Sequence, residues 1–227
     1  MKHPLAVLAV PIGNLEDISK RAISYLADAD YIFAEDTRRT KKLIELLKIS
    51  TNASIKSYRE QNHDIAAPLI KKCIDSGAKV VLVSDSGTPA ISDPGYLLIE
   101  DLRQHGYEVI AVPGPSSVIA ALSIAGISTE KFLFLGFFPK KGNKRFEELD
   151  QARQIRATWV LLESPQRITK TLKILADRYG DSLKVAAIKE ISKLHERTFY
   201  GNISEVYAQV CKSNTKGEWV LVGRFVE

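Results

Sequence analysis

The first half of this 227-residue chain alternates short apolar runs, many of them rich in β-branched residues, with longer amphipathic stretches. The short runs are typical of buried strands, and the amphipathic stretches place apolar residues on one helical face. Strands that alternate with helices at this spacing predict right-handed crossovers and a mainly parallel sheet. The predicted strands are 5–10, 31–35, 54–58, 78–84 and 108–112, and the predicted helices are 15–29, 37–49, 63–77, 94–106 and 116–126.

The pattern changes in the second half, where the last strands follow one another with little helix between them. This arrangement favours a mixed sheet. We therefore predict an α/β fold with two α/β domains, residues 1–126 with a parallel sheet and residues 127–227 with a mixed sheet, which share a cleft. The strands of the second domain are predicted at 131–138, 158–163, 184–191, 196–202 and 218–227, with helices near 144–155, 166–179 and 203–212.

The overall charge and the chain's N-terminal residues restrict its partners and location. The net charge is +5, and basic residues outnumber acidic ones between Pro139 and Arg178, which suits either a nucleic-acid partner or a solvated helix face. The stretch "MKHPLAVLAVPIGN" is too short to span a membrane and lacks a small-residue cleavage site. Cys73 and Cys211 show no ligand spacing and are expected to be buried thiols. We expect a cytoplasmic protein.

The loops at the strand ends carry an unusual number of prolines, glycines and acids. In an open α/β sheet the ligand crevice lies beyond the carboxyl ends of the strands. Because several such loops meet at one sheet edge, they predict a ligand site. The loops are "PIGN" (11–14), "AEDTRRT" (34–40), "DSGTPAISDPG" (85–95), "PGPSS" (113–117) and "ESPQR" (163–167).

The residues of these loops narrow the class of ligand. Neither a Walker pattern nor G-x-G-x-x-G occurs, and the two aspartates of "DSGTPAISDPG" would repel a diphosphate. Carboxylates suit ribose hydroxyls or a cationic ligand instead. S-adenosylmethionine offers a ribose diol, a positive sulfur and an ammonium group without phosphate. No metal site is predicted, because the histidines are scattered and no metal-ligand spacing occurs.

Several motifs, taken in order, carry a resemblance to a known family. They are "VPIGNLEDIS", "AEDTRRT", "VSDSGTPAISDPG", "VPGPSS", "GFFPKKGNKR", "ESPQR", "KLHE" and "KGEWVLV". Together they resemble the bacterial small-subunit (16S) ribosomal RNA methyltransferases that methylate a cytidine 2′-hydroxyl. Those enzymes belong to the tetrapyrrole-methylase-like class of S-adenosylmethionine-dependent enzymes. The resemblance implies two α/β domains, S-adenosyl-L-methionine folded in the cleft between them, and a homodimer.

The resemblance also assigns residues to the cofactor. Asp93 and Pro94 are expected to start the next helix rather than to meet the ligand. Many members of the family continue into a small C-terminal extension. We expect its lack here to affect RNA affinity more than cofactor binding. The expected cofactor-binding residues are Pro11, Ile12, Val83, Ser84, Asp85, Ile91, Ser116, Ser117 and Glu163.

An aspartate after the second strand is the proton acceptor of porphyrin-directed relatives, and Asp36 matches that position. We expect Asp36, or secondarily Glu35, to be the catalytic base. Capping of the helix that begins near Thr37 is the alternative role of both acids. Arg59 aligns with a basic proton donor, but an arginine does not readily lose a proton, so Arg59 is expected to make an electrostatic contact.

The expected substrate is ribosomal RNA, free or within the small ribosomal subunit, and the expected reaction is 2′-O-methylation of a cytidine. Phe137 or Phe138 could stack on a base. Two alternatives remain: a methyltransferase of the same class that acts on a tetrapyrrole or another small molecule, and a non-catalytic RNA- or partner-binding module. The basic segment disfavours the first, and the intact cofactor loops disfavour the second. The expected RNA-binding residues are Arg38, Arg39, Arg59, Lys140, Lys141, Lys144 and Arg145.

Overall fold

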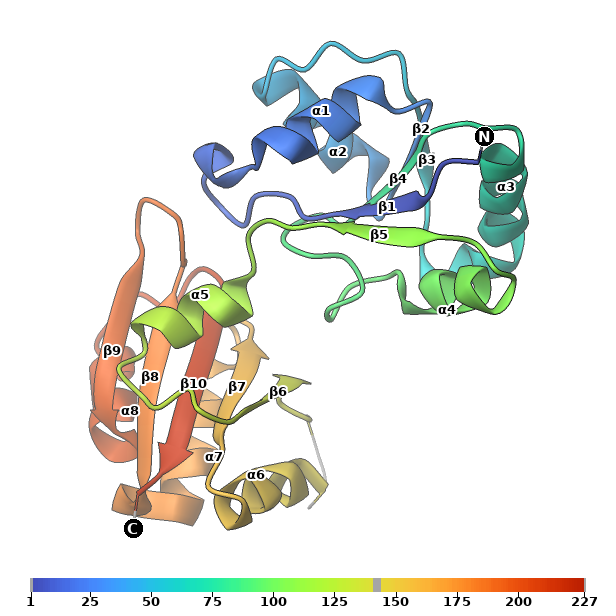
Figure 1. Ribbon diagram of the computed structural model, residues 1–227. Coiled ribbons are helices and arrows are strands. Elements are labelled where there is room, and N and C mark those ends of the chain that lie inside the picture. Colours follow the sequence, from blue (N-terminus) through green and yellow to red (C-terminus); the bar gives the residue numbers. More distant parts are fainter. Residues whose placement is uncertain (1, 141–143, 227) are drawn as a thin grey trace. The chain divides into compact units, whose positions relative to one another are not determined.

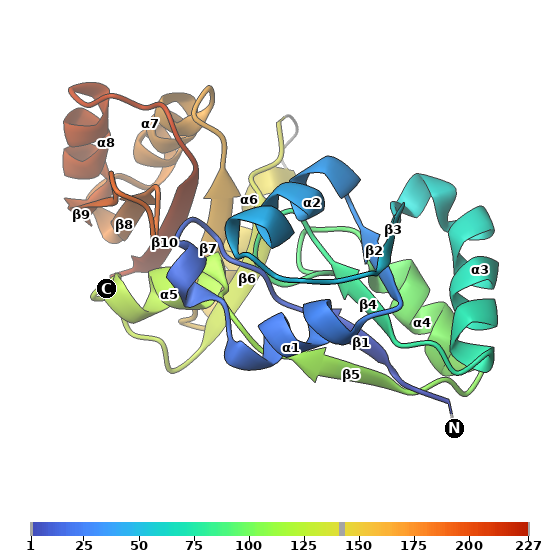
Figure 2. The ribbon, with the colours of Figure 1, turned by 90° about the horizontal axis from the view of Figure 1, so that it is seen from above.

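The chain folds into two compact units, Met1–Ser116 and Ser117–Glu227. The computed structural model describes residues 2–140 and 144–226. Each unit carries one five-stranded sheet, and Figures 1 and 2 show both with their helices. Of the helices in the described parts of the chain, none is both long and apolar enough to cross a bilayer.

The sheet of the first unit is parallel throughout, as the alternation of strands and helices predicts. Its order is β3-β2-β4-β1-β5, so the first strand lies between the fourth and fifth strands of the chain. Four-residue runs of buried apolar side chains explain the central strands, since both faces of a parallel sheet are covered. The strands are β1 (Leu5–Leu8), β2 (Tyr31–Ala34), β3 (Ser54–Ser57), β4 (Val80–Val83) and β5 (Val109–Val112).

Helices cover both faces of this sheet (Figure 2). Alternate side chains of β1 illustrate this, because Leu5 packs with α3 and α4 whereas Leu8 packs with α1 and α2. The helices and 3₁₀ turns of the unit are η1 (Leu15–Asp17), α1 (Lys20–Asp28), α2 (Thr37–Leu46), η2 (Glu60–Asn62), α3 (His63–Asp75) and α4 (Tyr96–Gln104).

Two helix starts differ from the sequence prediction. The single helix predicted at 15–29 is a 3₁₀ turn followed by α1, because the Ser19 hydroxyl accepts a hydrogen bond from the Ala22 N–H and caps the helix there. The prediction that Asp93 and Pro94 start a helix is wrong. Gly95 is the N-cap of α4, with a φ of 141° that favours glycine, so both residues lie in the preceding loop.

The sheet of the second unit is mixed, as predicted. Its order is β6-β7-β10-β8-β9, in which β6 and β7 are parallel and the pairs that include β10 or β9 are antiparallel. Gly223 lies opposite Trp159 in this sheet, and its lack of a side chain leaves room for the indole ring. The strands are β6 (Phe132–Phe137), β7 (Thr158–Glu163), β8 (Leu183–Lys189), β9 (Arg197–Asn202) and β10 (Trp219–Phe225).

Helices α6, α7 and α8 bury one face of this sheet in a single apolar core. Helix α5 contacts β10 and belongs to the second unit, so the units divide at Ser116/Ser117 rather than after residue 126, the boundary expected from the sequence. Cys211, expected to be buried, is exposed near the end of α8. The helices and 3₁₀ turn are α5 (Ser117–Ile124), α6 (Lys144–Gln154), α7 (Ile168–Tyr179), η3 (Gly180–Ser182) and α8 (Ile203–Cys211).

Candidate active site

Three loops at the carboxyl edge of the first sheet are tied to one another through their backbones. Val10, after β1, and Gly87, after β4, form an antiparallel bridge with N–H to C=O distances of 2.9 and 3.1 Å. The Thr88 hydroxyl donates to the carbonyl of Pro115, after β5, at 3.3 Å. Three of the five loops that the sequence assigns to one ligand site therefore meet, as the topology of a parallel sheet requires.

Two glycines allow this close approach. A Cβ on Gly114 would lie 3.1 Å from the Cβ of Ala9 and 3.3 Å from its carbonyl oxygen. Gly87 has a φ of 73°, and a Cβ there would contact Ile12 at 3.4 Å. A side chain at position 114 would push the β5 and β1 loops apart, and one at position 87 would strain the backbone, so both glycines allow the close approach of these loops.

The cofactor residues expected in this unit take up different environments. The side chains of Ile12, Val83 and Ser84 are buried, and Val83 packs in the apolar core, which leaves its backbone for a ligand. The Ser84 hydroxyl lies 3.1 Å from the Ser86 carbonyl oxygen and 3.4 Å from that of Gly87, within its own loop. Ile91 is half exposed, whereas Pro11 and Ser116 are partly buried.

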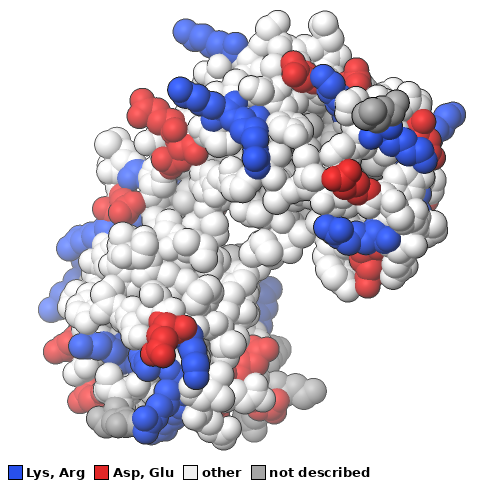
Figure 3. Space-filling model, in the orientation of Figure 1, with Lys and Arg blue, Asp and Glu red and all other residues white. Residues whose placement is uncertain are grey.

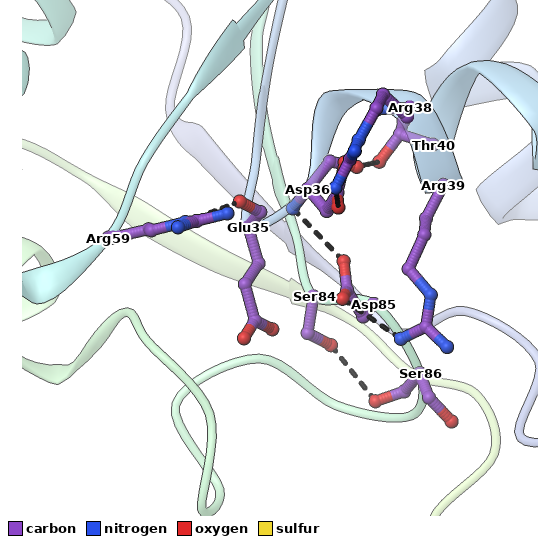
Figure 4. Close-up of polar contacts among 9 residues, drawn as sticks. All are labelled: Glu35, Asp36, Arg38, Arg39, Thr40, Arg59, Ser84, Asp85 and Ser86. Atoms are coloured by element: carbon purple, nitrogen blue, oxygen red, sulfur yellow. Dashed lines mark hydrogen bonds and ion pairs between the residues drawn. The ribbon is translucent and has the colours of Figure 1, made fainter.

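Asp85 links the β4 loop to helix α2. One carboxylate oxygen accepts a hydrogen bond from the Asp36 N–H at 3.0 Å, and the other accepts from Arg39 at 2.9 Å (Figure 4). Asp85 and Arg39 therefore neutralise each other, and the carboxylate helps to cap α2.

Asp36 caps the same helix, which is the alternative role considered for it. Its carboxylate accepts from the Arg38 N–H at 2.9 Å and from the Arg38 guanidinium at 3.0 and 2.6 Å. These hydrogen bonds with Arg38 hold the pKa of Asp36 well below its usual value. A carboxylate held in this way is a weak base, so the geometry favours a positioning role.

Glu35 directs its carboxylate away from Arg59 and toward the side of the β4 loop on which Ser84 lies (Figure 4). The Nε of Arg59 donates to the backbone carbonyl of Glu35 at 3.0 Å. Arg59 therefore fixes the end of β2, and the Glu35 carboxylate faces the loop.

Asp93, which the sequence places in the ligand loop but assigns to the start of the next helix, also lies at this edge. It is partly buried in the β4–α4 loop. Burial, together with the charges of Glu35 and Asp85, raises the pKa of Asp93 to about 7, against a hydrogen bond with Ser84 that lowers it. The motif "SDPG" by itself predicts a helix start, so only the fold reveals that Asp93 shares the site with Glu35.

The two cofactor residues expected in the second unit are Ser117 and Glu163. Ser117 is partly buried at the start of α5. Glu163 is 2% exposed, and its carboxylate accepts from the Thr171 hydroxyl at 2.6 Å and pairs with Arg167 at 3.3 Å. Arg167 also donates to the Phe138 carbonyl, so Glu163 holds the ends of β6 and β7 to helix α7.

The expected RNA-binding cations are not equally available. Arg38 pairs with Asp36 and Arg39 with Asp85, whereas Lys140 is exposed. Phe137 is 55% exposed and Phe138 is buried, so only Phe137 presents a ring that a base could contact. On the face drawn in Figure 3, basic and acidic side chains are interspersed. Lys141 and the side chains of Lys144 and Arg145 lie outside the described residues.

The loop cluster suits a ligand that carries positive charge and hydroxyls. It offers backbone groups and carboxylates, and residues 83–96 include no lysine or arginine. S-adenosylmethionine has these properties. In the described parts of the chain, no three histidine, cysteine or acidic residues are grouped to hold a metal ion.

A parallel five-stranded sheet in one unit and a mixed one in the other, with the tied loops of the first, agree with the family match. The chain belongs to the family described as Tetrapyrrole (Corrin/Porphyrin) Methylases, whose pattern matches residues 4–207. It is therefore a methyltransferase by family.

Within that class, curated relatives cover nearly the whole chain. Ribosomal RNA small subunit methyltransferase I of Halalkalibacterium halodurans is 38% identical over 225 residues, which are 97% of this chain and 75% of the relative. The protein of that name from Thermotoga maritima is 38% identical over 218 residues, 96% of each chain. These relatives confirm the resemblance drawn from the motifs.

Solved structures confirm the fold. A diphthine synthase aligns with a TM-score of 0.75 at 14% identity, covering 96% of this chain and 88% of that one. A cobalt precorrin-4 methyltransferase aligns with a TM-score of 0.69 at 19% identity, covering 96% and 93%. At such identities the likeness concerns the fold and carries no substrate.

Proposed function

We propose that this protein transfers a methyl group from S-adenosyl-L-methionine to the 2′-hydroxyl of a cytidine in small-subunit ribosomal RNA. The observation that carries the RNA substrate is the 38% identity, over nearly the full chain, to enzymes named ribosomal RNA small subunit methyltransferase I. The cytidine and the ribose oxygen come from the motif resemblance. The homodimer and the cytoplasmic location expected from the sequence belong to the same proposal.

In this proposal the loops after β1, β4 and β5 hold the cofactor. Backbone groups at Pro11, Ile12, Val83 and Ser116, with the exposed Ile91 side chain, would contact its adenosine and methionine portions. The motif resemblance also assigns Ser117 and Glu163, which belong to the second unit, to cofactor binding. When bound, S-adenosylmethionine supplies an electrophilic methyl group.

The residues of the protein must hold the ribose hydroxyl in line with that methyl group and accept the hydroxyl proton. Alignment at about 3 Å between the reacting atoms lowers the barrier by making the step effectively unimolecular. A base is most effective when its pKa lies near the working pH. Asp93 meets that condition, with its pKa raised to about 7 by burial and by Glu35 and Asp85.

We therefore propose that Asp93, with Glu35 nearby, accepts the proton. Asp36 instead caps α2 and so fixes the start of this helix. The hydroxyl proton moves to the Asp93 carboxylate as the oxygen–methyl bond forms and the sulfur–methyl bond breaks. The sulfur keeps that bonding pair and becomes a neutral thioether. Atoms and charge balance, and no further reactant is needed.

Methylation of small ribosomal subunits tests this function. Subunits from a strain that lacks the corresponding methyltransferase are incubated with the protein and S-adenosylmethionine, and the nucleosides are identified by mass spectrometry. We expect 2′-O-methylcytidine. A base-methylated nucleoside would refute the ribose assignment, and an unmodified RNA alongside measurable cofactor binding would refute the RNA substrate. Sedimentation of the purified protein checks the homodimer, and a monomer would refute it.

A further inference from the structure

A cavity of about 660 Å³ opens at one end of the second sheet, among residues that the methyl-transfer proposal does not use. It is lined by the loop that joins β8 to β9 and by the loop that joins α8 to β10. In the strand register Lys189 lies opposite Arg197 of β9 on one side and opposite Trp219 of β10 on the other. Both loops therefore join the sheet at neighbouring positions of the same end (Figure 1). Its volume is in the usual range for small-ligand sites.

The two loops are held together by a network around Lys193. The Lys193 ammonium pairs with Glu190 at 2.9 Å and with Glu218 at 2.8 Å. The Glu190 N–H donates to the Glu218 carbonyl at 2.8 Å, and the Glu218 N–H donates back to the Glu190 carboxylate at 2.8 Å. Because these bonds join the loops directly, the walls of the cavity are formed before any ligand arrives.

The acids that line the cavity already have hydrogen-bond partners within the β8–β9 and α8–β10 loops. Glu190 is engaged by Lys193 and by the Glu218 N–H, and Glu196 accepts from the Ser192 N–H at 2.6 Å. The pKa of Glu190 is held below its usual value by the Glu218 N–H and Lys193, against burial, so it stays ionised within these bonds.

Two of the basic side chains that line the cavity have fewer charged partners than the acids. Among the described residues neither Arg197 nor Lys216 forms an ion pair with an acid. The Arg197 guanidinium lies over the Phe199 ring, 4.8 Å from its centroid, which restricts its orientation and leaves its N–H groups for a ligand. His195 is exposed at the same rim. The cavity therefore favours an anion.

We propose that this cavity binds a phosphate-bearing nucleotide of the RNA substrate through Arg197 and Lys216. The inference rests on the proposed function, which supplies a polyanionic substrate. The Arg197 fork suits two phosphate oxygens, and Lys216 adds a second positive charge. Phe199 is 3% exposed and offers no face to a base, so the contact reads the RNA backbone and not its sequence.

Binding of a fluorescently labelled single-stranded RNA at several salt concentrations tests this site. The Arg197→Ala/Lys216→Ala variant is compared with Lys72→Ala/Lys131→Ala, which removes the same charge from exposed positions outside the cavity. We expect the cavity variant to bind at least about tenfold more weakly, with a salt slope smaller by about 0.7 for each phosphate that the variant no longer neutralises. The control variant should change little.

Melting temperatures of both variants check that they fold, and the single variant Lys216→Glu, on an exposed loop, provides a second test of the same charge. Equal RNA affinity and equal salt slope for the cavity variant and the wild type would overturn the proposal. So would weaker binding of S-adenosylmethionine by the cavity variant in calorimetry, because the cavity would then belong to the cofactor. A wild type that binds the cofactor but neither binds nor methylates RNA would instead refute the proposed function.

Discussion

The carboxylate of Asp85 accepts a hydrogen bond from the backbone N–H of Asp36 at 3.0 Å, and so joins the loop after β4 to the start of α2. Asp85→Ala removes this acceptor and the ion pair with Arg39. We expect the free energy of unfolding in urea to fall by about 1–2 kcal/mol, whereas Asp85→Asn, which keeps an oxygen acceptor, should cost less than about 1 kcal/mol. Asp28→Ala is the control, because Asp28 is 69% exposed and 3.9 Å from Lys79. Equal losses for Ala and Asn would mean that the ion pair, and not the cap, stabilises this corner.

The raised pKa of Asp93 predicts a pH dependence of methyl transfer. Below about pH 7 the carboxyl is protonated and cannot accept the hydroxyl proton. We expect kcat/KM to rise with pH to a plateau, with its midpoint near the pKa of Asp93. In Asp93→Asn the midpoint should disappear and kcat should fall by about 10²-fold or more. An unchanged profile in this variant would exclude Asp93 as the base.

The raised pKa of Asp93 also makes the stability of the fold depend on pH, and stability falls over the pH range in which activity rises. The folded-state pKa of Asp93 lies above the unfolded value, so its contribution to stability is complete below the unfolded pKa of about 3.9 and is lost as the pH rises through about 7. Asp93→Asn should therefore melt at a higher temperature than the wild type at pH 8 and show a smaller gain at pH 5. A variant that is more stable but less active separates a chemical role from a structural one.

Asp36 provides a contrasting case. Asp36→Asn keeps a side-chain oxygen for the Arg38 N–H and loses only the charge, so kcat should fall by less than about tenfold. Asp36→Ala removes the cap and should lower the melting temperature. Single-turnover methyl transfer measures the chemical step directly. If Asp36→Asn loses as much activity as Asp93→Asn, then Asp36 is the base and the assignment above is wrong.

Gly114 tests whether the tied loops form the cofactor site. In Gly114→Ala the added methyl group would press on Ala9 at 3.1 Å and separate the β5 and β1 loops. We expect the affinity for S-adenosylmethionine in calorimetry to fall by at least about tenfold, or about 1.4 kcal/mol. The neighbouring exposed Pro113 offers a matched control in Pro113→Ala. Full affinity in Gly114→Ala would place the cofactor elsewhere.

Much of this architecture could be predicted from the sequence, because it depends on local patterns. Apolar runs such as β4 can only be buried strands, and glycines after them mark the loops of the sheet edge. The environment of Asp93 could not be predicted, since it arises from Glu35, which follows another strand, and from a Gly95 φ that delays the helix. The burial of Glu163 could not be predicted either, because it depends on a tertiary contact with Thr171 on the next helix.

The unit boundary was predicted too late in the chain for a related reason. Helix α5 follows β5 at the spacing of the preceding strand–helix pairs, so its sequence alone assigns it to the first sheet. Its contact with β10 becomes visible only in the fold, because β10 is the last strand of the chain. Local spacing thus identifies the helix but not the sheet against which it packs.

The strand order of the first unit also has a consequence for biosynthesis. Among the described residues β1 pairs only with β4 and β5, so Leu5–Leu8 finds its strand partners there only when residues 80–83 and then 109–112 leave the ribosome. At about 5–20 residues per second, this leaves the first strand unpaired for several seconds. Long-range pairing of this kind slows folding, because the loop must close before the contacts form. Until then the newly made Leu5–Leu8 segment is an apolar strand with unpaired backbone groups, which is the kind of segment prone to misassociation.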